Sequence, residues 1–274
     1  MTDVSIPVAR TAWRGHASVE GVRRVAEEAP VALTYGRTTH AVMLATPGDL
    51  EDFAYGFSLS EGIIASPADV TALEVVTVRD GIELRMDLAG DRQEALTRRQ
   101  RHLAGPSGCG LCGLDSLAAA IRPVPRVPAG PTLTTGTIEA AMRSMVPAQT
   151  LNADTHAVHA AAFWTPTRGL VALREDVGRH NALDKLAGAL ARAETSVDHG
   201  IVLLSSRISV EMVQKAATLG ATVVAAVSAP TALAIRTADA AGITLIGIVR
   251  PDGFEVFTHP DRIQQEPVAE RHVA

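Results

Sequence analysis

The chain has 274 residues and a formal net charge of −5, with 47% hydrophobic and 20% charged residues. This composition is typical of a folded globular protein and excludes a disordered chain, while the acidic balance argues against broad nucleic-acid binding. Residues 1–7 lack the basic start and apolar run of a secretory signal, and the most apolar stretch, 221–235, is too short to span a bilayer. We therefore expect a cytoplasmic protein.

The first third of the chain predicts a small α+β domain over residues 29–121, preceded by an N-terminal tail at residues 1–28. Residues 30–45 have the pattern of a strand, a turn and a second strand. Thr46-Pro47-Gly48-Asp49 predicts the start of a helix, with Thr46 as its cap, that ends near Gly62. A second hairpin is predicted around the turn at Asp80-Gly81.

A proline-rich segment separates this part from the rest of the chain. A basic stretch at 92–102, a loop with two cysteines and a short helix at 114–121 precede it. Residues 122–131 contain Pro123, Pro125, Pro128 and Pro131, and so many prolines can continue neither a helix nor a sheet. We place a linker and a domain boundary there.

The second half alternates short Val- and Ile-rich segments with helical ones, which is typical of βαβ units around a mainly parallel sheet. We expect an α/β domain over residues 132–263 with helices flanking the sheet, and a polar tail at 264–274. The expected strands are 160–164, 170–173, 201–205, 222–227, 244–249 and an edge strand at 255–258, and the expected helices are 181–193, 210–219 and 232–241.

The only two cysteines, Cys109 and Cys112, lie in the glycine-rich loop 108–113. Thiolate is the reactive form of cysteine, and nearby positive charge or a helix N-terminus increases its fraction. The upstream basic stretch and the helix expected at 114–121 supply both conditions, and the glycines allow the loop to expose its sulfur. The pattern therefore favours sulfur chemistry with Cys109 as the reactive residue.

Several chemistries fit such a pair. The loop can carry a persulfide, act as a dithiol–disulfide oxidoreductase, form half of a zinc site, or be inert. Structural zinc usually takes four ligands, and without a second cysteine pair only histidines such as His102, His156 and His159 could complete a site. Spacing alone leaves these alternatives open.

A second polar block, residues 175–185 with the letters EDVGRHNALDK, falls between a predicted strand and a predicted helix. Such loops are where open α/β sheets bind ligands, and Arg179 and His180 are the candidate ligand residues. The simpler interpretation is a helix start, in which Asp176 or Asn181 caps the helix and residues 184–185 lie in solvent.

Two further turns at strand ends could hold an anion on a helix N-terminus. They are Ser205-Ser206-Arg207 and Ser228-Ala229-Pro230-Thr231. Each turn alone is weak evidence for an anion site, because Ser and Thr commonly cap helices. Together the two turns favour a phosphate or nucleotide ligand. No P-loop motif occurs in the chain.

Taken together, the chain resembles the FdhD/NarQ family of formate dehydrogenase accessory sulfurtransferases over about residues 30–263. The block EDVGRHNALDK is the most specific part of this resemblance. The other segments that carry it are Thr46-Pro47-Gly48-Asp49, residues 59–64, Cys109-Gly110-Leu111-Cys112-Gly113, Ser206-Arg207 with residues 211–216, Ser228-Ala229-Pro230-Thr231 and Thr258-His259-Pro260.

The resemblance implies a sulfurtransferase that takes sulfur from a cysteine desulfurase as a persulfide. It would deliver that sulfur to the bis(molybdopterin guanine dinucleotide) cofactor of formate dehydrogenase, as a terminal ligand of molybdenum or tungsten. Cys109 would carry the persulfide and Cys112 would assist. The family's cofactor contact falls on Ile248-Val249-Arg250-Pro251-Asp252-Gly253. The resemblance also implies a homodimer and a larger domain similar to the cytidine deaminase fold.

One turn departs from the family pattern, because Thr155-His156-Ala157-Val158-His159 lacks two glycines that many members have there. A deaminase activity is excluded, since zinc deaminases need an H-x-E motif ahead of a P-C-x-x-C motif, and this order is missing from the sequence. A chaperone that binds the molybdenum cofactor without sulfur chemistry remains an alternative, and we expect no resident metal.

Overall fold

The computed structural model describes residues 3–100 and 124–266, and these fall into two compact units. Of the described residues, the first unit combines 3–100 with 149–161 and 172–196, and the second contains 124–148, 162–171 and 197–266. The second and third segments of the first unit follow the proline-rich segment in the sequence. The linker and domain boundaries expected from the sequence stay a prediction.

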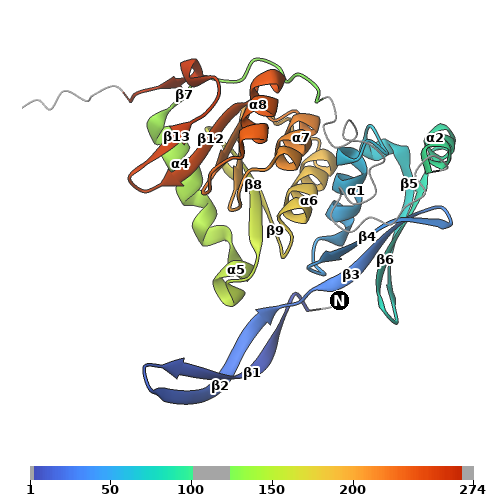
Figure 1. Ribbon diagram of the computed structural model, residues 1–274. Helices are drawn as coiled ribbons and strands as arrows, with labels where there is room; N and C mark the ends of the chain where they lie inside the picture. Colours follow the sequence, from blue (N-terminus) through green and yellow to red (C-terminus); the bar gives the residue numbers. More distant parts are fainter. Residues whose placement is uncertain (1–2, 101–123, 267–274) are drawn as a thin grey trace, which may run out of the picture. The chain divides into compact units, whose positions relative to one another are not determined.

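The first unit begins with a long hairpin, in the segment where we expected a tail. Strands β1 (Ser5–Arg14) and β2 (Ala17–Ala26) pair antiparallel along their whole length, from Ser5 opposite Ala26 to Arg14 opposite Ala17. Gly15 takes a positive φ of 62° in the turn between them, a conformation that costs glycine little. We call these two strands the arm (Figure 1).

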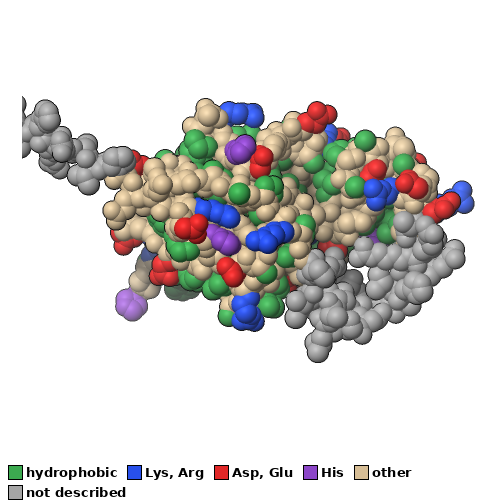
Figure 2. All heavy atoms as spheres, turned by 90° about the horizontal axis from the view of Figure 1, so that it is seen from above, with side chains coloured by type: hydrophobic (Ala, Val, Ile, Leu, Met, Phe, Trp, Pro, Cys, Tyr) green, Lys and Arg blue, Asp and Glu red, His purple; other side chains and the backbone are tan. Residues whose placement is uncertain are grey.

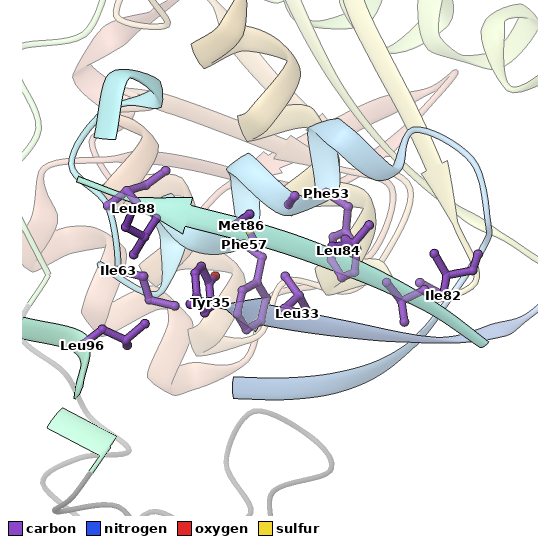
Figure 3. Packing of buried hydrophobic residues seen from close by; sticks show 14 residues of the cluster. Leu33, Tyr35, Phe53, Phe57, Ile63, Ile82, Leu84, Met86, Leu88 and Leu96 are labelled. Atoms are coloured by element: carbon purple, nitrogen blue, oxygen red, sulfur yellow. The ribbon is translucent and has the colours of Figure 1, made fainter. Parts of the chain in front are cut away.

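A four-stranded sheet follows, in the order β4-β3-β6-β5. Its strands are β3 (Ala29–Tyr35), β4 (Thr38–Ala45), β5 (Val70–Val78) and β6 (Gly81–Leu88), which confirms both predicted hairpins. Alternate residues of β3 and β6, including Leu33 and Leu84, are fully buried against Phe53 of helix α1 (Leu50–Ser60) (Figure 3). This period of two places a hydrophobic core on one face of the sheet only.

Helix α1 does not begin with the predicted cap. Its N-cap residue is Asp49, with a φ of 52° and no side-chain cap bond, whereas Thr46 lies outside the helix. The hydroxyl oxygen of Thr46 instead accepts a hydrogen bond from the backbone of Val177 at 3.1 Å. The capping prediction was wrong because a residue distant in sequence satisfies Thr46.

Helices α1 and α6 (Arg179–Arg192) cross at two glycines of the first unit. A Cβ atom on Gly56 would lie 1.7 Å from the carbonyl oxygen of Asp184, and one on Gly188 would lie 1.9 Å from that of Asp52. The two backbones can approach this closely only because neither glycine has a side chain. Among the described residues, this unit also contains α2 (Gly90–Gln100), α5 (Thr150–Thr155) and the 3-10 turn Pro67–Asp69.

The main sheet has six strands in the order β13-β12-β11-β10-β8-β9. Strands β10 (Ile201–Leu204), β11 (Val223–Ala226) and β12 (Thr244–Arg250) run parallel, and β13 (Gly253–Val256) pairs antiparallel at the edge. The division between the two units passes through β8 (His159–Thr165) and β9 (Gly169–Asp176). The predicted strands of the second half are confirmed.

Helices connect the parallel strands of the second unit, as expected from the alternating pattern. They are α7 (Val210–Leu219) and α8 (Ala232–Ala241), and α4 (Thr135–Met145) was not predicted. Short strands β7 (Leu133–Thr134) and β14 (Ile263–Gln264) pair parallel, and 3-10 turns cover Val146–Ala148 and Pro260–Arg262. The protein is therefore a mixed α/β fold with several sheets.

Within residues 3–100 and 124–266, none of the helices has the length and apolar character needed to cross a membrane. On the face drawn in Figure 2, acidic and basic side chains are interspersed among the hydrophobic ones. This dispersal agrees with the modest net charge of the chain.

Candidate functional site

The predicted catalytic residues, Cys109 and Cys112, lie outside the residues that the structure describes. The candidate site is therefore built from the other predicted residues, which fall into two groups. Residues 206–207 and 248–253 belong to the second unit, and Arg179 and His180 belong to the first.

In the second unit, three loops meet at one edge of the sheet, where the parallel strands β10, β11 and β12 end. Ile208 forms a parallel bridge with Pro230, and its carbonyl oxygen accepts a hydrogen bond from the backbone of Thr231 at 2.9 Å. The backbone of Ile248 donates to the carbonyl oxygen of Ser228 at 3.3 Å. Such edges are where open α/β sheets bind ligands.

The end of β12 has an unusual backbone. Ile248 has a φ of 52°, and the pairing of β12 with β13 shifts register between Gly247 and Arg250. A β-branched residue with positive φ is a rare and strained conformation, and such conformations concentrate at functional sites. This irregularity lies in the segment 248–253, where the family resemblance places the cofactor contact.

Arg250 ties this segment to the neighbouring strand. Its Nη1 donates to the backbone oxygen of Val227 and, at 3.0 Å, to that of Val249. Arg250, Pro251 and Asp252 are exposed, whereas Val249 is buried. The side chain of Arg250 therefore places a positive charge at the carboxyl end of the sheet.

Two helices present their N-termini at the same edge. In α8, the hydroxyl of Thr231 caps the helix by accepting from the backbone of Ala234 at 3.3 Å. In α7, the N-cap residue Ser209 makes no such cap bond, and its buried Oγ has no hydrogen-bond partner among the described residues. Backbone N–H groups of helix N-termini bind phosphate, so this edge of the sheet suits a phosphorylated ligand. We call it, with residues 206–209, 228–231 and 248–253, the ligand edge.

The sequence did not single out Ser209, although a Ser directly before an apolar helix is a recognisable cap signal. Of the two predicted residues nearby, Arg207 is exposed and Ser206 is buried. The hydroxyl of Ser206 donates to the carbonyl oxygen of Arg207 at 3.2 Å. The buried hydroxyl of Ser206 thus makes a hydrogen bond within the loop, while Arg207 is exposed to solvent.

The Thr258-His259-Pro260 turn lies at the other end of β12. The hydroxyl of Thr258 donates to the carbonyl oxygen of Ile243 at 2.6 Å and accepts from the backbone of Leu245 at 2.8 Å. Both partners are at the start of the strand, whereas Arg250 is at its end. This turn therefore holds the edge hairpin and is not part of the ligand edge.

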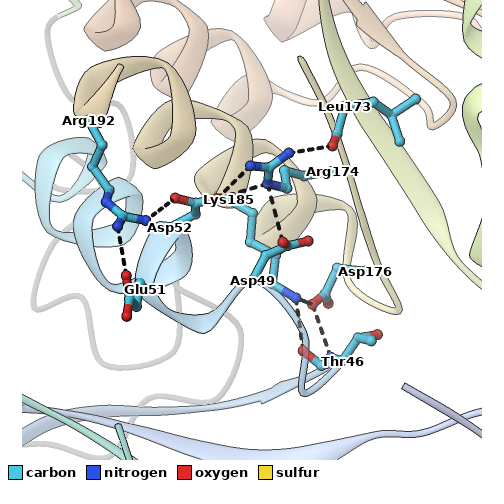
Figure 4. A network of polar contacts seen from close by, with 9 residues as sticks. All are labelled: Thr46, Asp49, Glu51, Asp52, Leu173, Arg174, Asp176, Lys185 and Arg192. Atoms are coloured by element: carbon cyan, nitrogen blue, oxygen red, sulfur yellow. Dashed lines mark hydrogen bonds and ion pairs between the residues drawn. The ribbon is translucent and has the colours of Figure 1, made fainter. Parts of the chain in front are cut away.

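In the first unit, the 175–185 block is a buried polar network rather than a solvated helix start. Nζ of Lys185 lies 2.6 Å from Oδ2 of Asp176, and neither side chain is exposed at all (Figure 4). Lys185 also donates to the carbonyl oxygen of Thr46 at 2.8 Å. The expectation that Asp184 and Lys185 lie in solvent was wrong, since both are buried.

Asp176 has partners on both carboxylate oxygens. Oδ2 accepts from the backbone of Thr46 at 3.0 Å, and Oδ1 accepts from the backbone of Gly178 at 2.7 Å and from Nδ2 of Asn181 at 2.9 Å. The amide of Asn181 also donates to the carbonyl oxygen of Leu44 at 2.8 Å. A buried charge is tolerated only with such full pairing, so the network fixes the turn that precedes α6.

Two other acidic residues of this block also point inward. The carboxylate of Glu175 accepts from the backbones of Leu151 and Asn152, both at 2.8 Å, and so caps helix α5. Oδ1 of Asp184 accepts from the hydroxyl of Ser60 at 2.7 Å. These roles could not be read from the sequence, because every partner is distant along the chain.

A second ion-pair cluster lies on the same helix pair. The carboxylate of Asp52 contacts Nη2 of Arg174 at 2.7 Å and Nη1 of Arg192 at 2.6 Å, and Arg192 also contacts Glu51 at 2.6 Å (Figure 4). The hydrogen bond that Arg192 donates to Asp52 raises the pKa of Arg192 above its ordinary value. The cluster links α1, α6 and β9 electrostatically.

Arg179 and His180 are the two residues of the block that we selected as ligand candidates, and both are half-buried at the start of α6. Nε of Arg179 is buried without a hydrogen-bond partner among the described residues. Burial lowers the pKa of nearby His159, and the positive charge of Arg179 lowers it further. The first unit therefore presents a guanidinium beside a histidine that is neutral near pH 7.

Within the described ranges, His, Cys, Asp and Glu side chains form no group of three or more that could hold a metal ion. His156, one of the histidines considered for zinc, instead ends helix α5 with a positive φ of 56°. That conformation is one that glycine adopts readily.

Comparison with known proteins identifies the class to which this fold and these motifs belong. The sequence matches the FdhD/NarQ family over residues 26–264, and the chain belongs to that family. It is 55% identical over 257 residues to a protein named sulfur carrier protein FdhD from Agrobacterium fabrum, covering 93% of this chain and 95% of the relative.

Two further proteins extend this comparison. A sulfur carrier protein FdhD from Brucella abortus is 53% identical over 261 residues, with 95% of this chain and 97% of the relative covered. The crystal structure of a formate dehydrogenase accessory protein from Desulfotalea psychrophila superposes with a TM-score of 0.73 at 25% identity, over 96% of this chain and 100% of that one. The likeness thus extends to nearly the whole chain.

Proposed function

We propose that this protein carries sulfur as a persulfide on Cys109 and delivers it for the maturation of formate dehydrogenase. A cysteine desulfurase supplies the sulfur, and the acceptor is the bis(molybdopterin guanine dinucleotide) cofactor of the dehydrogenase. The cofactor is a substrate here rather than a resident group. Names of relatives, sulfur carrier protein and formate dehydrogenase accessory protein, support this assignment.

The ligand edge of the second unit supports the part of the proposal that concerns binding of the guanine dinucleotide cofactor. The ends of three parallel strands bring together Arg250, the N-termini of α7 and α8, and the Ser209 hydroxyl, which has no hydrogen-bond partner in the part of the chain that the structure describes. A guanine dinucleotide carries a pyrophosphate, which helix N-termini and guanidinium groups bind well. We assign residues 206–207 and 248–253 to this contact. Arg179 and His180, in the first unit, are separate candidates for binding the cofactor.

Sulfur transfer to the protein follows ordinary thiol exchange. The Cys109 thiolate attacks the sulfane sulfur of the donor persulfide, a new S–S bond forms on Cys109, and the donor cysteine leaves as a thiolate. This step exchanges one S–S bond for another, and it needs neither oxidant nor reductant. A low thiol pKa at Cys109 would favour capture at neutral pH.

Delivery as a terminal sulfide of the metal needs two electrons. The Cys112 thiolate would attack the inner sulfur of the Cys109 persulfide, forming a Cys109–Cys112 disulfide and releasing the outer sulfur as sulfide. A dithiol reductant then restores both thiols for the next cycle. In this scheme Cys109 is needed for loading, and Cys112 is needed for release.

Three further features complete the proposal. The protein acts in the cytoplasm, it pairs as a homodimer, and the fold of its C-terminal α/β domain, residues 132–263, is similar to that of cytidine deaminases. The desulfurase and the dehydrogenase apoenzyme are its protein partners.

Formate dehydrogenase activity in cells tests the proposal. Cells that lack this protein would receive the wild-type chain, Cys109→Ala or Cys112→Ala, and the variant proteins would be purified to measure bound molybdenum and guanine nucleotide. We expect Cys109→Ala to abolish activity while the cofactor still copurifies. Full activation of the dehydrogenase by Cys109→Ala would instead support a cofactor chaperone without sulfur chemistry.

A further inference from the structure

The arm presents large apolar side chains to solvent along most of its length. Val19 is 60% exposed and Val22 is 66% exposed, and Ile6, Val8 and Trp13 are exposed as well. Ten residues in each strand correspond to a ribbon roughly 33 Å long. A two-stranded hairpin without a covered face is only marginally stable in water, so an arm of this kind indicates a partner surface.

The base of the arm is fixed within the first unit. Nε of Arg24 lies 2.7 Å from Oδ2 of Asp154, the hydroxyl of Ser5 donates to the same carboxylate at 3.1 Å, and Arg23 donates to the carbonyl oxygen of Thr155 at 3.2 Å. These bonds attach one end of the ribbon to helix α5. Trp13, Val19 and Val22 lie beyond this anchor, whereas Ile6 and Val8 lie next to it.

The register divides the arm into two different faces, because directly paired residues share a face and successive residues alternate. One face, which we call the cationic face, combines four aliphatic residues with three arginines and has no acidic residue. Its members are Ile6, Val8, Arg10, Arg14, Val19, Arg23 and Val25 with small residues between them. The opposite face carries Trp13, Val22, Arg24 and Glu20 and has no net charge.

The same unit contains a surface with complementary character, the outer face of the β4-β3-β6-β5 sheet. Val42 and Leu44 on β4 are 51% and 57% exposed, and they pair with Ala32 and Pro30 on β3. The other half of this face carries three carboxylates and one guanidinium. These are Glu74 on β5 and Glu83, Arg85 and Asp87 on β6.

We propose that the cationic face of the arm docks on the outer face of this sheet in a second copy of the chain. The arms are exchanged reciprocally about a two-fold axis. Aliphatic residues of the arm would cover Val42 and Leu44, and its arginines would meet the carboxylates on β5 and β6. The inference specifies the surface for the homodimer proposed above and rests on that proposal.

Charge supports a second copy as the occupant. Four arginines against Glu20 give residues 5–26 a charge of +3, so the other residues sum to −8 within a chain whose total is −5. The arm is therefore attracted to the rest of another copy. An arm roughly 33 Å long also exceeds the width of four strands spaced about 4.8 Å apart, so it can cross the whole face.

A matched pair of substitutions on the arm tests the proposal. Val19→Ser changes the cationic face and Val22→Ser changes the opposite face at nearly equal exposure. Sedimentation equilibrium should show a dimer dissociation constant raised by about tenfold or more in Val19→Ser and nearly unchanged in Val22→Ser. A monomeric wild-type chain, or equal effects of the two substitutions, would overturn the docking.

A pair of charge-reversal substitutions tests the docking of the arm even if Val19→Ser disturbs the structure of the arm. Arg10→Glu and Glu74→Arg should each weaken self-association, and mixing the two variants should restore a mixed dimer, because both contacts in it are complementary. Failure of the mixture to associate better than either variant would contradict the model of exchanged arms.

Photo-cross-linking locates the surface directly. A benzophenone amino acid at position 19 should yield cross-linked dimers whose peptides map to residues 38–45 or 70–88 of the other copy, and one at position 22 should not. Cross-links from position 19 to other segments would reject the docking surface. Persulfide loading of Cys109, measured on the same samples, reports separately on sulfur transfer.

Discussion

The ammonium group of Lys185 lies 2.6 Å from the carboxylate of Asp176, with both side chains fully buried. Both residues belong to the block EDVGRHNALDK, whose polar residues resemble a ligand-binding loop in sequence. In the structure most of them hold the protein together, and only Arg179 and His180 remain as ligand candidates there. The block 175–185 therefore serves largely to stabilise the first unit.

Removing one partner of this pair should be costly. Lys185→Met leaves the Asp176 charge buried without its cation, and we expect a loss of about 3–5 kcal/mol in the free energy of unfolding. Urea denaturation measures it, with Arg143→Met on the exposed side of α4 as a control that changes little. Adding Asp176→Asn should recover part of the loss, and strict additivity would refute the coupling.

The crossing of α1 and α6 should tolerate no side chain at its two glycines. Gly56→Ala and Gly188→Ala each place a methyl group within 2 Å of a carbonyl oxygen, and each should destabilise the fold by about 3 kcal/mol or more. Gly90→Ala, where nothing lies within 4 Å of the new atom, serves as the control. Thermal unfolding that is unchanged in Gly56→Ala would show that the helices do not pack this closely.

Glu175 should stabilise helix α5 from a distance. Glu175→Gln keeps one acceptor oxygen for the two backbone amides and removes the charge, so we expect a loss of about 1–2 kcal/mol. Hydrogen exchange at Leu151 and Asn152 should accelerate selectively. Equal protection of these amides in the variant, or the same loss in Glu255→Gln at an exposed strand position, would argue against the cap.

Stability should fall on mild acidification because of His159. Burial and Arg179 hold its folded-state pKa below the ordinary value of 6.5, so the unfolded chain binds the proton first as pH falls. The neutral histidine's contribution is complete above pH 6.5 and declines below it. His159→Gln should therefore lose less stability than wild type between pH 7.5 and 5.5 in urea titrations, and an unaltered pH slope would disprove this assignment.

The ligand edge should lose affinity without Arg250. With GDP as the probe, Arg250→Ala should weaken binding by about tenfold or more, because a guanidinium–phosphate contact is lost. Isothermal titration at fixed salt would measure this, with Arg168→Ala as an exposed control in the same unit. Equal affinity in Arg250→Ala would remove this residue from the site.

Regular alternation made much of the fold predictable. The strands and helices of the second half follow Val- and Ile-rich runs separated by helical periods, and each expected strand is present. The arm was not predicted, because apolar residues and arginines occur on both of its faces and the period-two signal is weak.

Tertiary contacts explain what the sequence could not reveal about the site. Thr46-Pro47-Gly48-Asp49 matches a helix start, yet Asp176 and Val177, about 130 residues away, take up the polar groups of Thr46. Lys185 looked like a surface residue because lysine is seldom buried without a partner, and its partner is set by the fold. Loops at strand ends, by contrast, were correctly placed at the edge of the sheet from the βαβ pattern.

Intact-protein mass spectrometry after incubation with a cysteine desulfurase and free cysteine tests persulfide formation on Cys109. We expect a mass gain of one sulfur atom that a reductant removes, that persists in Cys112→Ala, and that is lost in Cys109→Ala. A wild-type chain that gains no sulfur, or a Cys109→Ala chain that gains as much as wild type, would contradict it.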